Sequence, residues 1–385
     1  MGGDLLRGKV LMRHSGKTFA VMLGVIIHLA FCVNGIWAET DEARPLRAVK
    51  TEDPPPAVYH NPPPAVRPLI TAHALEQDLT RRYIVQYSSA SGIAWLNAVM
   101  KRGSLYLPFI KEEIARRNMP LELAYLPVIE SGFQSSARSK SGAVGLWQFM
   151  MNSIAPFDIK VNDFVDERRD FQKATRGALS KLNENYRILG DWELALTAYN
   201  AGLGAVNKAL KNAKTRNYWE LCREKKLKPE TVQYIPKLVA ISYILSQPRR
   251  FGLDCWHNSV AWTSIPLGRQ VSLDVLASES GADRELLRRL NAELLLGISP
   301  ADKNYRLKVP LAQLPIISEV LERKDLPLIH YYYYVIRQGD TLSALSKHYG
   351  VPLNFIEQHN PGILNRFLKI GETVIIPAFQ EKSPP

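Results

Sequence analysis

The chain has 385 residues, 46% of them hydrophobic, so it holds enough apolar material for a core and for more than one domain. Its formal net charge is +12 at pH 7, which suits an anionic partner such as nucleic acid, a membrane surface or a cell wall. No helix-turn-helix or RNA-binding signature accompanies this charge, so nucleic acid is excluded as the expected partner.

The first 38 residues predict export. A basic region comes before a nearly unbroken apolar stretch over 19–33, and Ala38 is a small residue at a plausible cleavage position before Glu39. We therefore interpret 1–38 as a signal peptide. An uncleaved membrane anchor is the alternative, and Cys32 is a weak hint of lipidation. The basic residues are Arg7, Lys9, Arg13 and Lys17.

Residues 39–70 are rich in proline, including the runs 54–56 and 62–64, and predict an extended linker with no fold of its own. Of the cysteines beyond the signal, Cys222 and Cys255 either pair or remain two separate buried thiols.

Apolar residues recur at helical spacing from about residue 70. A helix is expected to start at Tyr106, and a break at Met119-Pro120 begins the segment that ends at Glu130. The charge run 166–170 predicts a solvated face. Trp147 and Trp192 are expected in the core.

The stretch 126–150, LPVIESGFQSSARSKSGAVGLWQFM, carries the candidate chemistry. Glu130 ends an apolar run, where desolvation raises a carboxyl pKa toward the value that a general acid needs near neutrality. Glycines such as Gly142 and Gly145 let a bulky polymer approach the backbone. The plainer alternative is that Glu130 merely ends a helix.

No second acid lies beside Glu130 in the sequence, although Asp166 and Asp170 are able to approach it in space. Ordinary glycosidases use two carboxylates, so a single acid needs an explanation. The histidines are scattered and no zinc-type motif is present, so neither a metal nor a cofactor is expected.

These residues resemble the lytic transglycosylase family, most closely its membrane-bound murein type D. The family runs E-S-x-F-x-x-x-A-x-S and G-A-x-G-L-W-Q-F-M match residues 130–139 and 142–150. Its A-Y-N-A-G and Y-V-P-K elements match 198–202 and 234–237. The resemblance implies a lysozyme-like domain in which one glutamate, here Glu130, acts first as acid and then as base.

The resemblance also implies roles for further residues. Ser139 is expected near the acid and the acetamido group of the sugar, and Gln148, on an expected following helix, contacts substrate. Tyr199 and Asn200 are expected to hold Glu130 and the sugar, and Tyr234 closes the far side of the cleft.

The last 54 residues predict a different kind of module. A strand at 334–336, two helices and a closing strand at 374–377 resemble a LysM module, which implies binding to N-acetylglucosamine chains. The residues expected to serve that module are Gly339, Asp340, Thr341, Asn360 and Pro361. A fainter copy lies upstream at a constant offset of 69 residues, so 256–328 is interpreted as a degenerate LysM-like unit.

The expected architecture is a mainly α lysozyme-like catalytic domain followed by small βααβ LysM-type α+β modules. The expected domains are 1–38 signal peptide, 39–70 linker, 71–255 lysozyme-like transglycosylase domain, 256–328 degenerate LysM-like unit and 332–378 LysM domain. The resemblance implies a periplasmic peptidoglycan lytic transglycosylase that forms 1,6-anhydro products, with membrane attachment through the N-terminus left open. The alternatives are a muramidase that lets water attack and a non-catalytic wall-binding scaffold.

Overall fold

The computed structural model describes residues 68–378, except 163–164, 255–259, 301 and 303. Contacts divide the chain into Met1–His60 and Asn61–Pro385, and every element below belongs to the second unit. The expected signal peptide, Cys32, Cys255 and nearly all of the linker lie outside the described residues. Among the helices that the structure does describe, none is long and apolar enough to cross a membrane.

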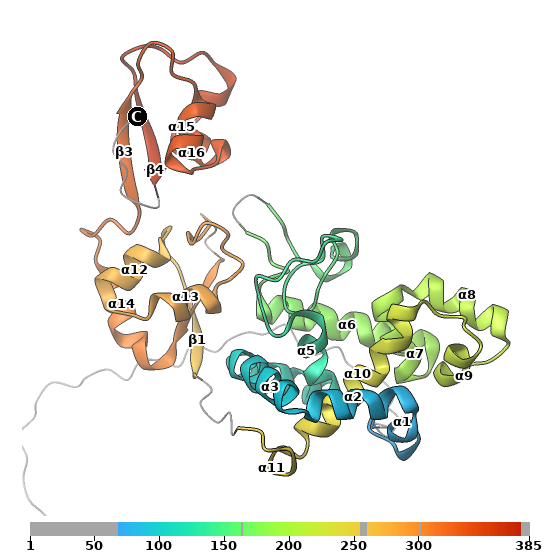
Figure 1. The fold of residues 1–385 in the computed structure, drawn as a ribbon. Helices are drawn as coiled ribbons and strands as arrows, with labels where there is room; N and C mark the ends of the chain where they lie inside the picture. Colours follow the sequence, from blue (N-terminus) through green and yellow to red (C-terminus); the bar gives the residue numbers. More distant parts are fainter. Residues whose placement is uncertain (1–67, 163–164, 255–259, 301, 303, 379–385) are drawn as a thin grey trace, which may run out of the picture. The chain divides into compact units, whose positions relative to one another are not determined.

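Residues 72–251 are mainly helical, as the apolar spacing predicts, and the helices pack around one core (Figure 1). Trp147 and Trp192 both belong to that core, which confirms their expected placement. The elements are α1 (Ala72–Glu76), α2 (Asp78–Ser88), α3 (Ala90–Gly103), α4 (Leu107–Arg116), η1 (Leu121–Tyr125), α5 (Leu126–Ser131), η2 (Met151–Ser153), η3 (Ala155–Phe157), α6 (Phe171–Leu189), α7 (Trp192–Ala201), α8 (Leu203–Ala213), α9 (Tyr218–Arg223), α10 (Pro229–Leu245) and α11 (Pro248–Phe251).

Helix α6 has clear start and stop signals. The Asp170 carboxylate accepts hydrogen bonds from the backbone N–H groups of Gln172 and Lys173, which would otherwise lack partners in the first turn. Gly190 ends the helix in the left-handed conformation, with φ of 73°, which glycine adopts without steric cost. The helix is thus fixed at both ends.

The charge run that begins at Asp166 is not the solvated face that its composition predicts. Asp166, Arg168 and Asp170 are all buried. Arg168 forms an ion pair with Asp166 at 2.7 Å, and the Lys308 ammonium lies 2.9 Å from Asp170 and 2.6 Å from Glu293. The charges are tolerated inside because each has a partner of opposite sign. Composition alone does not reveal those partners.

The C-terminal third contains two antiparallel strand pairs, β1 with β2 and β3 with β4, each enclosing two helices in the chain. In Figure 1, β3 and β4 run side by side with α15 and α16 next to them. The elements are β1 (Trp262–Pro266), α12 (Leu273–Ser280), α13 (Arg284–Leu290), β2 (Arg306–Pro310), η4 (Leu311–Gln313), α14 (Leu314–Glu322), β3 (His330–Val335), α15 (Leu342–Tyr349), α16 (Leu353–His359), η5 (Ile363–Asn365) and β4 (Thr373–Ala378). The α+β class expected for this region is confirmed.

The sequence repeat corresponds to repeated structure. Helices α12 and α15 start 69 residues apart, as do α13 and α16. Asn291 and Asn360 occupy equivalent positions, and each ties the end of the second helix to the closing strand. Asn291 donates to the carbonyl of Lys308 and accepts from its N–H, and Asn360 does the same with Ile375. Helix α14 is an addition that the repeat does not indicate.

Candidate functional site

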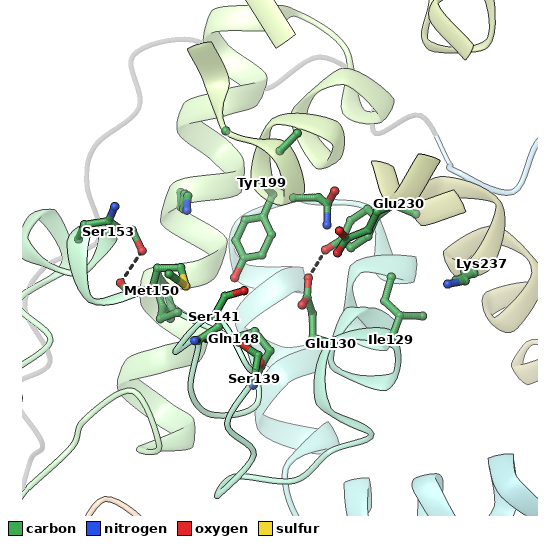
Figure 2. A pocket seen from close by; sticks show the side chains of 18 residues that line it. Ile129, Glu130, Ser139, Ser141, Gln148, Met150, Ser153, Tyr199, Glu230 and Lys237 are labelled. Atoms are coloured by element: carbon green, nitrogen blue, oxygen red, sulfur yellow. Dashed lines mark hydrogen bonds between the residues drawn. The ribbon is translucent and has the colours of Figure 1, made fainter. Parts of the chain in front are cut away.

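A cavity of about 740 Å³ opens in the helical region (Figure 2). The six side chains expected for the catalytic site all line it, although they come from four separate stretches of the chain. They are Glu130, Ser139, Gln148, Tyr199, Asn200 and Tyr234.

Glu130 is presented by the short helix α5, which starts with Leu126-Pro127 and stops at Gly132 in the left-handed conformation, with φ of 59°. Leu126 and Val128 of this helix are buried in the core, while Glu130 faces the cavity. The Tyr234 hydroxyl donates a hydrogen bond to Glu130 Oε1. The acid is therefore held by a partner 104 residues further along the chain.

Burial raises the pKa of Glu130 from 4.5 to about 7. The hydrogen bond from Tyr234 lowers this pKa because it stabilises the carboxylate, and the Lys181 cation lowers it too. The negative charge of Glu230 raises it. With a pKa near 7, the group exists in both protonation states at neutral pH, which suits a residue that gives and later takes a proton.

The loop after Glu130 is anchored to its neighbours on both sides. The Ser131 hydroxyl donates to the Leu146 carbonyl at 2.9 Å, which ties the loop to α5. The buried Trp147 indole donates to the Thr175 hydroxyl at 2.9 Å, which ties it to α6. A Cβ on Gly145 would collide with the Arg168 carbonyl, so this close approach requires glycine.

Ser139 and Gln148 both belong to that loop. The Ser139 backbone N–H donates to the Ala143 carbonyl at 2.9 Å, and its hydroxyl accepts from the Ala143 N–H at 3.0 Å. Gln148 does not lie on a helix, which corrects the expectation from the sequence. It occupies a turn with φ of +50°, and its amide donates to the Gly145 carbonyl at 2.9 Å. Tertiary contacts fix that turn, and local sequence pattern does not report them.

Tyr199 and Asn200 lie at the end of α7. The Tyr199 hydroxyl donates to the Trp147 carbonyl at 2.8 Å, so this tyrosine supports the loop and does not hydrogen bond to Glu130. Asn200 Oδ1 accepts from the Thr231 hydroxyl at 3.0 Å, which joins α7 to the first turn of α10. Of the two tyrosines, Tyr234 is the one that holds the acid.

Three charged residues beyond the expected ones line the cavity. Lys237 on α10 belongs to the element 234–237 that the sequence analysis matched, and Lys181 on α6 and Glu230 on α10 were missed. Glu230 lies four residues before Tyr234, so the two share one face of α10, and that spacing was an available signal. Nothing in the sequence pattern around Lys181 indicated it. Asp166 and Asp170, considered as second acids, do not line the cavity and are engaged in ion pairs.

Three of the residues expected for the LysM module make internal hydrogen bonds. Asp340 accepts from the Tyr334 hydroxyl at 2.9 Å, Thr341 caps the N-terminus of α15, and Asn360 joins α16 to β4. These contacts build the module. Glycan contact by these residues, and by Gly339 and Pro361, stays a prediction. Throughout the described part of the chain, no group of three or more His, Cys, Asp or Glu is placed to hold a metal.

Residues 108–222 match the Transglycosylase SLT domain family, and residues 334–377 match the LysM domain family. The chain is 32% identical over 304 residues to the membrane-bound lytic murein transglycosylase D of Escherichia coli strain K12. That match covers 74% of this chain and 66% of the relative, so the chain spans about two thirds of the relative's length.

Two further matches are shorter. A putative tributyltin chloride resistance protein of Alteromonas is 38% identical over 125 residues, which are 32% of this chain and 59% of that protein. The crystal structure of the 70 kDa soluble lytic transglycosylase of Escherichia coli has a TM-score of 0.33 and 23% identity, over 37% of this chain and 24% of that one. A structural likeness this low supports no conclusion by itself. The sequence matches are sufficient: the chain is a homologue of membrane-bound lytic murein transglycosylase D that carries a Transglycosylase SLT domain and a LysM domain.

Proposed function

We propose that the protein is a peptidoglycan lytic transglycosylase that cleaves the β-1,4 bond between N-acetylmuramic acid and N-acetylglucosamine. The observation that carries the proposal is Glu130, a carboxyl with a pKa of about 7, bonded to Tyr234 on the wall of a large cavity. The match to the SLT domain family supports the choice of substrate and reaction.

In the first step, protonated Glu130 gives its proton to the glycosidic oxygen, and the N-acetylglucosamine side departs as an alcohol. In the second step, the Glu130 carboxylate takes the proton of the 6-hydroxyl of the same muramic acid. That oxygen bonds to the anomeric carbon and closes a 1,6-anhydro ring. No water is consumed, and Glu130 ends protonated, ready for the next cycle.

The hydrogen bond from Tyr234 fits both steps. Its phenol stabilises Glu130 when the carboxyl is ionised, after the first transfer. Burial pushes the pKa of Glu130 in the opposite direction and restores the acid form. Burial keeps Tyr234 itself protonated by raising its pKa well above 10, so it remains a donor throughout.

Hydrolysis is the second candidate reaction, and Glu230 is the observation that favours it. This exposed carboxylate lines the same cavity as Glu130, and two carboxylates on one cavity are what a muramidase needs to activate water. Figure 2 shows Glu130 and Glu230 among the side chains that line the cavity. The chemical identity of the product distinguishes the two reactions.

We assign the LysM module the task of retaining the enzyme on glycan, in line with its family match. A periplasmic location fits the name of the membrane-bound relative and the export signal expected at the N-terminus. Membrane attachment through that N-terminus remains the second possibility, and the part of the chain involved lies outside the described residues.

Replacement of Glu130 with glutamine tests the catalytic proposal. Glutamine keeps an oxygen that can accept from Tyr234 but cannot give or take the proton, so release of soluble fragments should fall at least about 100-fold. Glu184→Gln, which changes an exposed glutamate on α6, is the matched control and should keep wild-type activity. If Glu130→Gln retained more than about a tenth of the activity, the assignment of Glu130 as the acid and base would be wrong. The scaffold alternative predicts that both proteins bind glycan and that neither cleaves it. Cleavage by the wild type, together with glycan binding but no cleavage by Glu130→Gln, therefore supports the catalytic proposal against the scaffold.

A further inference from the structure

Lys181 lies in the wall of the catalytic cavity, and neither step of the reaction proposed above assigns it a proton or a contact with substrate. It stands on α6 six residues after Thr175, whose hydroxyl fixes Trp147. Its ammonium lies 5.0 Å from the centroid of the Tyr199 ring, and Tyr199 is itself held by the Trp147 carbonyl. The lysine is therefore directed onto a rigid surface inside the cleft.

This ammonium has no counter-ion within the described part of the chain. Over the described residues no carboxylate lies at ion-pair distance from Lys181, whereas Lys173 pairs with Glu167 and Lys308 pairs with two acids. Burial lowers the pKa of Lys181, and the more distant carboxylates of Glu130 and Glu184 raise it. A partly buried cation without a partner gains more from an incoming anion than an exposed or paired one does.

The charges that face Lys181 do not substitute for such an anion. Glu130 must be neutral when it acts as the acid, so it cannot serve as a permanent partner. Glu184 is exposed on the same helix, and Glu230 and Lys237 line the cavity from another helix, α10, with no ion pair to Lys181 among the described residues. Among the described residues that line the cavity, Lys181 is thus a cation available to bind a substrate group, and it lies over the Tyr199 ring, whereas Lys237, the other lysine there, lies over the Tyr83 ring.

The proposed substrate carries anions only on its muramic acid side. N-acetylglucosamine is neutral, whereas each muramic acid bears a lactyl ether that ends in a carboxylate or continues into a peptide stem with carboxylates of its own. We propose that Lys181 binds a carboxylate on this lactyl arm or stem and makes the cleft favour anionic glycan over neutral glycan. The inference rests on the proposed function, because it takes peptidoglycan as the substrate.

Binding of a substrate carboxylate by Lys181 must be distinguished from the influence of Lys181 on the pKa of Glu130. Removing the cation also changes the acidity of Glu130, but that change acts on every substrate alike. When kcat/KM on an anionic strand is divided by kcat/KM on its neutralised counterpart, the change caused by the altered acidity of Glu130 cancels. This ratio reports on recognition and does not respond to a merely structural role.

The test compares the full-length wild type with Lys181→Met and Lys181→Arg. The substrates are stem-free glycan strands with free lactyl carboxylates, the same strands with these groups converted to methyl amides, and strands that keep their peptide stems. Lys111→Met is the matched control, because Lys111 also lies over a tyrosine ring, Tyr125 at 5.8 Å, but does not line the cavity.

Lys181→Met should lower kcat/KM about tenfold on the anionic strands and less than about twofold on the methyl amides, the size expected for losing a charge-assisted hydrogen bond. Lys181→Arg should retain most of the preference, and Lys111→Met all of it. A loss on stem-free strands identifies the lactyl carboxylate, and a loss confined to peptide-bearing strands identifies the stem.

Equal losses on anionic and neutralised strands would overturn the inference. A wild type that cleaves no glycan would instead refute the proposed function. In that case the affinities of wild type and Lys181→Met for the same strands, measured by calorimetry, still decide the role of Lys181.

Discussion

Replacing Glu130 with glutamine should alter how the stability of the protein depends on pH. The folded state holds the pKa of Glu130 at about 7, while 4.5 is the value for a solvated glutamate. Between these two pH values the unfolded chain releases the proton and the folded chain keeps it. Stability is therefore full below about pH 4.5 and falls as the pH rises toward 7. The loss amounts to about 3 kcal/mol.

A glutamine at position 130 does not titrate, so the variant does not lose that stability over this pH range. The free energy of unfolding of Glu130→Gln, relative to wild type, should rise by about 3 kcal/mol between about pH 4 and about pH 8. Glu193 also has a pKa raised to about 7 by burial, but it contributes equally to both proteins and cancels. Denaturant titrations followed by tryptophan fluorescence measure the difference, and none of the seven tryptophans lies in the LysM module at 332–378.

The control is Glu184→Gln, whose side chain stays exposed after folding. Its stability relative to wild type should change by less than about 0.5 kcal/mol over the same range. If Glu130→Gln behaved like this control, Glu130 would be as well solvated as a surface residue, and its assignment as a buried acid would be refuted.

Two further predictions concern other parts of the chain. Deleting residues 332–385 should leave cleavage of soluble fragments intact but weaken retention on insoluble sacculi, measured by co-sedimentation, because the LysM module has its own strand pair; unchanged retention would contradict the binding role. Lys308→Met should lower the free energy of unfolding by about 3–5 kcal/mol, because it leaves Asp170 and Glu293 buried without their cation. A change below about 1 kcal/mol in denaturant titrations would show that the three groups are not desolvated together.

The sequence indicated the catalytic acid because its local context carries the chemistry. An acid at the end of an apolar run, followed by a loop rich in glycine and serine, predicts that desolvation raises the pKa of Glu130, and the structure places this residue in a half-buried position. The positions of Tyr199, Asn200 and Tyr234 followed from the family resemblance. The hydrogen-bond partners of these residues did not follow from the resemblance. A sequence cannot say that the Tyr234 hydroxyl reaches Glu130 while the Tyr199 hydroxyl reaches the Trp147 carbonyl.

Most of the errors have one physical origin. Charged residues at Asp166 and Asp170 predict solvent exposure on composition. Asp166 is buried with its near neighbour Arg168, and Asp170 is buried with Lys308, a long-range partner that the sequence does not reveal. Lys181 was missed for the same reason, since packing between distant helices decides which charges line the cavity. Glu230 was missed although its spacing from Tyr234 on α10 was a local signal. In contrast, the β-α-α-β order of the C-terminal third followed from turn residues and from the 69-residue repeat, which are local signals.

The product of the reaction tests the central claim most directly. The 6-hydroxyl of the bound muramic acid is held beside the anomeric carbon, and such an intramolecular group can have an effective concentration on the order of 10⁵ M or more. Digestion of purified peptidoglycan in heavy-oxygen water, followed by mass spectrometry, should give 1,6-anhydromuramic ends that are lighter by one water and carry no label. Reducing ends that carry the heavy oxygen would show that water attacks the anomeric carbon, and the protein would then be a muramidase.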